Sequence, residues 1–171
     1  MAVMRDLVKE FIDRSQLAGE DFDNTPTRVE NFWNDFLHQE QPICTSFRSD
    51  NKEMITLKDY KCWGFCPHHL LPVQYTFKVS YLPDGRVLGL SKLIRVINYL
   101  LKDLPIQEDL PTLIVNFINS KLAPKGVACR VEGFHLCMAM RGVKSEATVV
   151  TTALKGCFVD DPSAKEEFLK A

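Results

Sequence analysis

Two short segments combine cysteine and histidine at spacings that suit a metal site. They are Cys66-Pro67-His68-His69 and His135-Leu136-Cys137. Cys66 and His69 can be reached from one turn, and His135 and Cys137 would project from the same face of a predicted strand. Thiolate and imidazole ligands together favour zinc, and three protein ligands would leave one position open for a water. We therefore expect a zinc site built from these two segments.

Two other interpretations of these segments stay open on residue types alone. The cysteines and histidines could be buried thiols and hydrogen-bonded core histidines without a metal. Alternatively Cys62, four residues before Cys66, could complete a closed structural site. Cys44, Cys129 and Cys157 are typical of small packed residues.

Several basic residues are candidates for an anion site. Ser91 is expected to cap a helix, with Lys92 and Arg95 on its first turn, and helix starts favour anions. Arg28 and Arg141 are further candidates because arginine binds phosphate bidentately. Each charge alone is more typical of a solvated helix face, so the anion site is a hypothesis that depends on the fold.

Gln107 and Glu108 are predicted to open the next helix. A glutamate in a first turn usually complements the helix dipole. A carboxylate there can also accept two parallel N–H bonds from a guanine edge. The residue types alone favour the interaction with the helix dipole.

Hydrophobic periodicity predicts an α+β fold. Residues 72–82 alternate apolar and polar side chains as a half-buried strand does, and a turn at Asp84-Gly85 suggests that 87–90 return as its partner. Helices are predicted over 3–15, from Thr25 onward, 91–103, 107–122 and 164–169, and further strands over 55–57, 126–139 and 147–158. The core order strand-strand-helix-helix-strand-strand (ββααββ) places two helices on one face of an antiparallel sheet. Its open edges suggest closure by other subunits.

Composition excludes several classes of protein. The chain has 171 residues, 46% of them hydrophobic, a net charge of -1 and a sequence pI of about 6.4. This suits a single folded domain and argues against a disordered chain, a membrane-spanning protein and a general nucleic-acid binder. We expect one domain over 1–171, with a helical segment over 1–40 and a core over 50–160. The absence of an export signal leads us to expect a cytoplasmic location.

The motifs together resemble the GTP cyclohydrolase I family, over nearly the whole chain from about residue 20. The matching stretches include the two cysteine-histidine segments, Thr25-Pro26-Thr27-Arg28-Val29, Leu88-Gly89-Leu90-Ser91-Lys92-Leu93, Ile106-Gln107-Glu108 and Met138-Ala139-Met140-Arg141-Gly142-Val143. The resemblance implies the T-fold, a ββααββ fold that agrees with the order of elements predicted above.

The resemblance also implies a role for each matching residue. Cys66, His69 and Cys137 would bind zinc, with water as the fourth ligand, and His68 and His135 would be the acid/base pair. Gln107 and Glu108 would read the guanine edge. The triphosphate would be bound by Arg28, Ser91, Lys92, Arg95 and Arg141.

The implied reaction opens the imidazole ring of GTP, releases C8 as formate and gives 7,8-dihydroneopterin triphosphate for pterin, folate or 7-deazaguanine synthesis. Members of the family form toroidal homo-oligomers, decamers, with active sites between subunits. This chain departs from the family at Pro67, where glutamate is usual, and at Val149-Val150. Two alternatives follow: a relative that acts on another purine nucleotide, and a non-catalytic zinc-stabilised nucleotide-binding module.

Overall fold

A computed structural model describes residues 2–171, which divide into two compact units, one ending at Glu40 and the other spanning Gln41–Ala171. The first unit holds α1 (Ala2–Arg14), a 3-10 turn η1 (Glu20–Phe22) and α2 (Thr25–Leu37). The predicted helices are present, although Asn24 rather than Thr25 is the N-cap residue of α2. Glu30 is buried in this unit and pairs with the Arg5 guanidinium at 2.5 Å.

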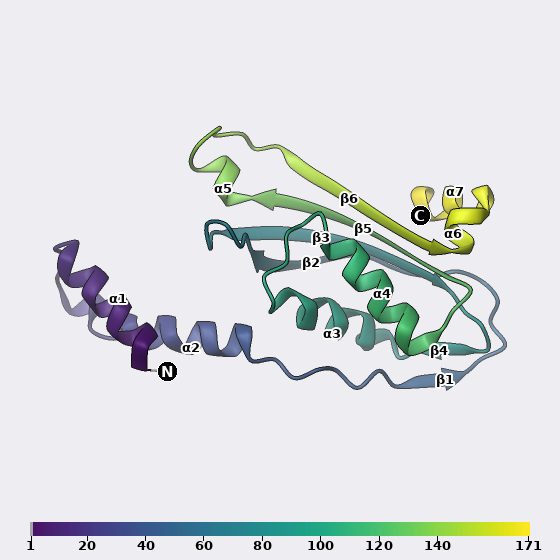
Figure 1. Cartoon of the computed structure of the whole chain (residues 1–171), viewed down its shortest axis with the longest axis horizontal. Helices are drawn as coiled ribbons and strands as arrows, with labels where there is room; N and C mark the ends of the chain where they lie inside the picture. Colours follow the sequence, from purple (N-terminus) through teal and green to yellow (C-terminus); the bar gives the residue numbers. More distant parts are fainter. Residues whose placement is uncertain (1) are drawn as a thin grey trace. The chain divides into compact units, whose positions relative to one another are not determined.

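An antiparallel sheet in the order β2-β3-β5-β6 forms the second unit (Figure 1). Its strands are β2 (Ile55–Phe65), β3 (Pro72–Leu82), β5 (Gly126–His135) and β6 (Thr148–Gly156). Helices α3 (Leu90–Leu101) and α4 (Leu110–Leu122) follow one another between β4 and β5 and cover one face of the sheet. The predicted ββααββ order is therefore confirmed.

The core lies between this sheet and the two helices. Alternate residues of β3 point into it, as the period of two predicts. They are at most 1% exposed and comprise Val73, Tyr75, Phe77, Val79 and Tyr81. The helices contribute buried aliphatic residues, among them Val96 and Ile97 from α3 and Ile114 and Ile118 from α4.

The opposite face of the sheet is partly covered by the C-terminal segment. Ala128 of β5 packs there against Phe158 of α6 (Cys157–Asp160) and Phe168 of α7 (Pro162–Lys170). Lys78 of β3 donates to the Phe168 carbonyl at 3.1 Å and so holds the last turn of α7 on this face. The sequence predicted a terminal helix but not its place on the second face.

The prediction that 87–90 return beside β3 is wrong. β4 (Arg86–Leu88) pairs instead with β1 (Ser46–Arg48) in a separate two-stranded sheet. Both edges of β3 are already taken by β2 and β5, so no ladder remains for a third partner. The Leu88 backbone N–H donates to the Tyr81 hydroxyl at 3.0 Å, which holds the two segments together after the turn at Gly85.

The starts of two helices also differ from prediction. α3 begins at Leu90 with Gly89 as its N-cap residue, so Ser91 lies inside the first turn and caps nothing. α4 begins at Leu110, one residue before Pro111, because proline fits a first helical turn. Gln107 and Glu108 therefore lie in the turn before α4 rather than in its first turn. Within residues 2–171, no helix is long and apolar enough to cross a membrane.

Candidate metal and substrate site

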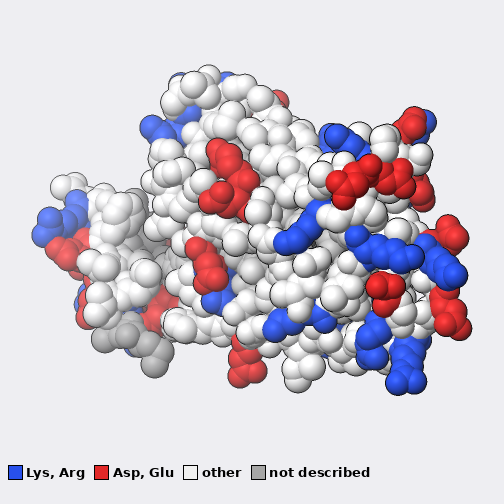
Figure 2. All heavy atoms as spheres, turned by 45° about the vertical axis from the view of Figure 1, so that its right-hand side comes forward, with Lys and Arg blue, Asp and Glu red and all other residues white. Residues whose placement is uncertain are grey.

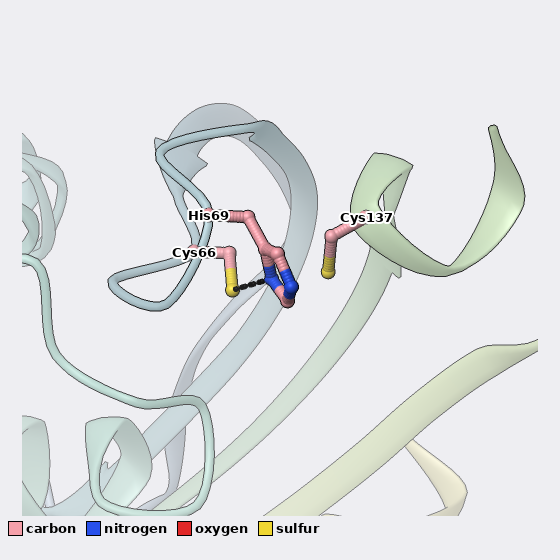
Figure 3. A group of neighbouring side chains, drawn as sticks. All are labelled: Cys66, His69 and Cys137. Atoms are coloured by element: carbon pink, nitrogen blue, oxygen red, sulfur yellow. Dashed lines mark hydrogen bonds between the residues drawn. The ribbon is translucent and has the colours of Figure 1, made fainter. Parts of the chain in front are cut away.

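Three side chains from two separate segments converge at one end of the sheet. Cys66, His69 and Cys137 each offer a ligand atom, and these atoms all lie within 4.8 Å of one another. Figure 3 shows Cys66 and His69 on the turn between β2 and β3, facing Cys137 across the site. Cys66 is 5% exposed, whereas Cys137 is half-buried and His69 is exposed. The group is therefore open on one side.

The turn after β2 is shaped by its own backbone. The Cys66 N–H donates to the Leu71 carbonyl at 2.9 Å, and the Cys66 carbonyl accepts from the N–H groups of His69 and Leu70 at 3.3 and 2.8 Å. Leu70 has a φ of 52°, which reverses the chain into β3. Pro67 takes the second position of this turn, where its fixed φ favours the bend. This bend brings the Cys66 Sγ and His69 Nδ1 to 3.7 Å.

Cys137 reaches the site from a short helix and not from a strand. β5 ends at His135, and α5 (Leu136–Ala139) begins at the next residue. The prediction that His135 and Cys137 share one face of a strand is therefore wrong. The register of β5 still brings Cys137 to the site. His135 pairs with Val73 beside the β2–β3 turn, which places α5 opposite Cys66.

The donor set fits a transition metal ion. Two thiols and one imidazole are the ligands that zinc prefers, and three protein ligands leave a coordination position for water or substrate. Burial, with the neighbouring Cys66, raises the pKa of the Cys137 thiol, and a bound cation would offset this by stabilising the thiolate.

Cys62 stands outside this group, among the residues that the structure describes. It lies within β2 opposite Tyr75, and burial raises the pKa of its thiol to about 11. Its sulfur is not among the ligand atoms that lie within 4.8 Å of one another, so the alternative of a closed site completed by Cys62 is not supported.

A cavity of about 180 Å³ adjoins the metal group. The cavity is lined by the three candidate ligands and by four other residues that the sequence predicted for the active site, His68, His135, Gln107 and Glu108. Tyr75, Pro67, Ile106 and Met138 complete the lining. Apolar walls with a few convergent polar groups are typical of small-molecule sites.

His135 is held between the sheet and this cavity. Burial lowers the pKa of its imidazole, and the negative charge of Glu108 partly opposes that shift. Its Nδ1 lies 4.0 Å from the Cys137 Sγ, and the edge of its ring meets the buried Tyr75 ring at a centroid distance of 6.2 Å. His68 lies on the other side, with Nδ1 3.6 Å from the Cys66 Sγ.

Gln107 is 3% exposed, and its amide is bonded within the protein. Its Nε2 donates to the carbonyls of Val149 at 2.8 Å and Val131 at 3.4 Å, and its Oε1 lies 2.6 Å from the His135 Nε2. The Thr151 hydroxyl donates to its backbone carbonyl at 3.2 Å. Glu108 is exposed and has its carboxylate available to a ligand.

Sequence reasoning missed four residues here, Tyr75, Thr151, Gly133 and Val149. Tyr75 was visible only as a strand residue, and Thr151 carries no signal of its own. Gly133 carried the signal of a glycine inside a strand, which often marks a close approach. Val149 takes part through its backbone, which no side-chain pattern predicts.

Arg141 is one predicted phosphate-binding residue that the structure places beside the metal group. Its guanidinium Nη1 donates to the His69 Nε2 at 2.6 Å, from the exposed segment after α5. A guanidinium at the mouth of the cavity can meet an anionic part of a ligand.

Three other predicted phosphate-binding residues lie at the opposite end of the second unit. Ser91, Lys92 and Arg95 are on the first turns of α3, which follows β4 at the opposite end of the sheet (Figure 1). β3 separates the two ends, and 11 strand residues span about 30 Å. Arg28 is exposed on α2, in the unit that ends at Glu40. Figure 2 brings forward the side with β1, β4 and α7, where Lys and Arg are interspersed with Asp and Glu.

Comparison with known sequences gives matches along the whole chain. The sequence profile described as GTP cyclohydrolase I matches residues 4–171. GTP cyclohydrolase 1 of Aquifex aeolicus is 37% identical over 180 residues, covering 99% of this chain and 97% of that protein. The protein of the same name from Methylococcus capsulatus is 36% identical, with 98% and 96% covered. For Deinococcus radiodurans the match is 41% identical and covers 73% of this chain and 58% of the relative.

Among solved structures, the archaeosine synthase QueF-Like in its apo form has a TM-score of 0.50 and 16% sequence identity. The match covers 63% of this chain and 97% of that one. At this identity the likeness concerns the fold alone, and it agrees with the predicted T-fold.

Proposed function

Because the chain belongs to the GTP cyclohydrolase I family, we propose that it converts GTP and water into formate and 7,8-dihydroneopterin triphosphate. One observation carries the proposal. The Cys66, His69 and Cys137 group and two further histidines surround one cavity, with a free carboxylate at its rim. A metal site without catalysis has no need of two non-ligand imidazoles beside it.

The metal is proposed to be zinc, held by Cys66, His69 and Cys137. Zinc is preferred over ferrous iron because two thiolates make the ligand set soft. When bound there, zinc supplies Lewis-acid activation of a water molecule. The open side of the group faces the cavity, which is where the guanine ring would lie.

His135 is proposed to hold the proton that activates the guanine ring. C8 is a poor electrophile until N7 is protonated, and an imidazolium beside the cavity can donate that proton. Burial favours release of the proton, and the Glu108 carboxylate keeps the charged form within reach. The net effect is a lowered pKa, which favours transfer of the proton to the base.

His68 is proposed to serve the later steps. Its exposed ring stands on the other side of Cys66 from His69, and can exchange protons with the ribose as its ring opens and rearranges in an Amadori-type step. Glu108 is proposed to orient the base by accepting N–H bonds from the guanine edge, with Gln107 beside it.

The triphosphate is proposed to lie between two copies of the chain. Arg141 is the predicted phosphate-binding residue near the cavity, and the α3 residues Ser91, Lys92 and Arg95 are at the other end of the sheet. A second copy that brings its α3 and its Arg28 to this cavity would complete the site. We accordingly propose a toroidal homo-oligomer, a decamer, in which residues 1–171 act as one domain in the cytoplasm, where GTP is available.

The test is formate release by purified, zinc-loaded protein incubated with GTP. We expect one formate per GTP consumed, about one zinc per chain, and a pterin that fluoresces after oxidation. Bound zinc without formate would contradict the proposal and favour a binding module.

Pro67 gives a reason to vary the substrate, because it stiffens the turn between two ligands. Measuring kcat/KM for GTP, dGTP and other purine nucleotides would identify the preferred base and sugar. A clear preference for GTP would exclude the alternative of a relative specialised for another purine nucleotide.

A further inference from the structure

The hydrogen bonds of Gln107 determine the direction of its side-chain amide. Its NH2 group faces the carbonyls of Val149 and Val131, which only accept hydrogen bonds. The amide oxygen must therefore face His135, whose Nε2 lies 2.6 Å away. Because that oxygen only accepts, the His135 Nε2 must carry a hydrogen and donate it.

This arrangement leaves the second nitrogen of His135 for chemistry. Nδ1 lies on the other side of the ring, 4.0 Å from the Cys137 Sγ, and so faces the metal group. In the neutral ring with hydrogen on Nε2, Nδ1 carries a lone pair directed toward the cavity side. The opposite tautomer would set an amide oxygen against a ring lone pair.

Gly133 provides the space in which this bond forms. A Cβ at this position would lie 2.1 Å from the Gln107 Oε1 and 2.9 Å from its Cδ. Both distances are too short for non-bonded atoms, so any side chain there would displace the amide. Gly133 is buried between Tyr75 and Val149 in the sheet, which leaves little room for the backbone to move away.

We propose that Gln107 is a positioning residue that holds His135 with hydrogen on Nε2 and leaves Nδ1 to exchange the proton with the substrate, and that Gly133 keeps the space for this bond. The role of the proton rests on the proposed function. The resemblance implied that Gln107 reads the guanine edge. To do so with its side chain, it would have to leave two backbone carbonyls and His135 without their partner.

The first test measures the tautomer and needs no turnover. Solid-state 15N NMR of the zinc-loaded full chain with labelled histidine would be assigned by comparison with a His135→Gln variant. We expect one His135 tautomer, with hydrogen on Nε2, and a mixture in Gln107→Met, which has similar volume but no hydrogen bond. Gln74→Met makes the same change at an exposed position of β3 and should leave the spectrum unchanged. Hydrogen on Nδ1 in the wild type, or an unchanged His135 signal in Gln107→Met, would overturn the proposal.

The second test separates positioning from direct recognition of guanine. We expect Gln107→Met to lower kcat by about 10- to 100-fold, as for loss of partners that orient a site histidine. KM for GTP should stay within about threefold, because the base-reading groups are intact. Zinc content should stay at the wild-type level. A raised KM with unchanged kcat would show that Gln107 contacts guanine and would overturn the proposal. If the wild type releases no formate, the proposed function fails while the NMR result still decides the tautomer.

The third test concerns Gly133. We expect Gly133→Ala to reproduce the kcat loss of Gln107→Ala, but to add less than about threefold in the Gln107→Ala background. There the two Gln107 atoms it would strike are gone, and only the His135 Nε2, 3.1 Å from the added Cβ, remains close. Circular dichroism would verify that each variant is folded. A full additional loss in the double variant would show that Gly133 acts on something other than Gln107.

Discussion

The two ends of the four-stranded sheet are built in different ways. At the end where His135 pairs with Val73, chain segments far apart in sequence enclose a cavity and a metal group. At the other end, where Leu82 pairs with Gly126, α3 begins, and its first turns carry the half-buried Lys92 and the exposed Arg95. The first end offers a cavity suited to chemistry on a ring, and the second offers positive charges.

This difference suggests how the two ends of the sheet could each bind a different part of a nucleotide. The proposed guanine site is at the first end, where the Arg141 guanidinium alone is little for a triphosphate of several negative charges. Lys92 and Arg95 lie on the first turns of α3, at the second end. Two copies that bring the first end of one next to the second end of the other would supply both the cavity and the positive charges. The predictions below concern the two ends in turn.

Loss of a metal ligand should abolish activity. We expect Cys137→Ser to lower formate release by at least about 10⁴-fold, because water activation and the open coordination position are both lost. Metal content by mass spectrometry should fall in parallel. Cys62→Ser is the matched control, since Cys62 lies nearby but outside the group, and it should keep both metal and turnover. Full activity in Cys137→Ser would refute the ligand assignment.

Removal of the His135 imidazole should lower kcat without loss of the metal. His135→Ala is expected to lower kcat by about 10²- to 10⁴-fold while zinc stays bound, since general acid–base catalysis is worth that much. His38→Ala, at the exposed end of α2, should be neutral. If His135→Ala also loses its zinc, His135 is a ligand and the division of roles is wrong.

Charges at the second end should affect binding. Arg95→Ala is expected to raise KM for GTP by about 10- to 100-fold, the value of one or two charge-assisted hydrogen bonds. The exposed Arg48 of β1 offers a control at the same end, and Arg48→Ala should leave KM unchanged.

The same variant can show whether two copies share a site. At GTP concentrations well below KM, where Arg95→Ala alone turns over slowly, Arg95→Ala mixed in equal amounts with Cys137→Ser, then dissociated and reassembled, should reach about a quarter of wild-type activity if each site takes one end from each copy. A rate no higher than that of the Arg95→Ala chains alone would place both ends of a working site in one chain.

The smallest expected effect concerns the thiol of Cys44, a half-buried residue just before β1. Burial raises its pKa, and the positive charges of Lys121 and Lys92 lower it in part. Lys92→Ala removes one of these charges, so the pKa should rise further and the thiolate fraction at pH 8 should fall. Alkylation of Cys44, followed by mass spectrometry, should slow by less than about threefold. Faster alkylation would show that Lys92 shields the thiol rather than stabilising its anion.

Local patterns predicted the parts of the fold that depend on periodicity. β3 was visible because every second residue from Val73 to Tyr81 is apolar, and α2 because apolar residues recur on one helical face. The metal ligands were also predictable from a local pattern, because a cysteine and a histidine three residues apart suit two ligands on one turn.

The pairing of distant segments was not visible. The position of β4 depends on which edges of β3 are already occupied. The change from strand to helix between His135 and Cys137 depends on where the pairing of β5 with β3 ends. The direction of the Gln107 amide follows from two backbone carbonyls, which have no signature in side-chain types. The start of α3 and the cavity lie at opposite ends of β3, and this separation becomes apparent only in the folded sheet.

The ligands of the metal group become available at different times as the chain is made. Cys66 and His69 share one turn and can capture an ion as soon as the segment between β2 and β3 has emerged from the ribosome. Cys137 joins only after β5 has been synthesised and paired. An ion held by these two ligands would also bind the unfolded chain, so its contribution to the stability of the native state would be limited to what the third ligand and the folded surroundings add. The order in which ions meet the chain would then matter, and a soft ion present in excess during synthesis would have the advantage over one supplied later.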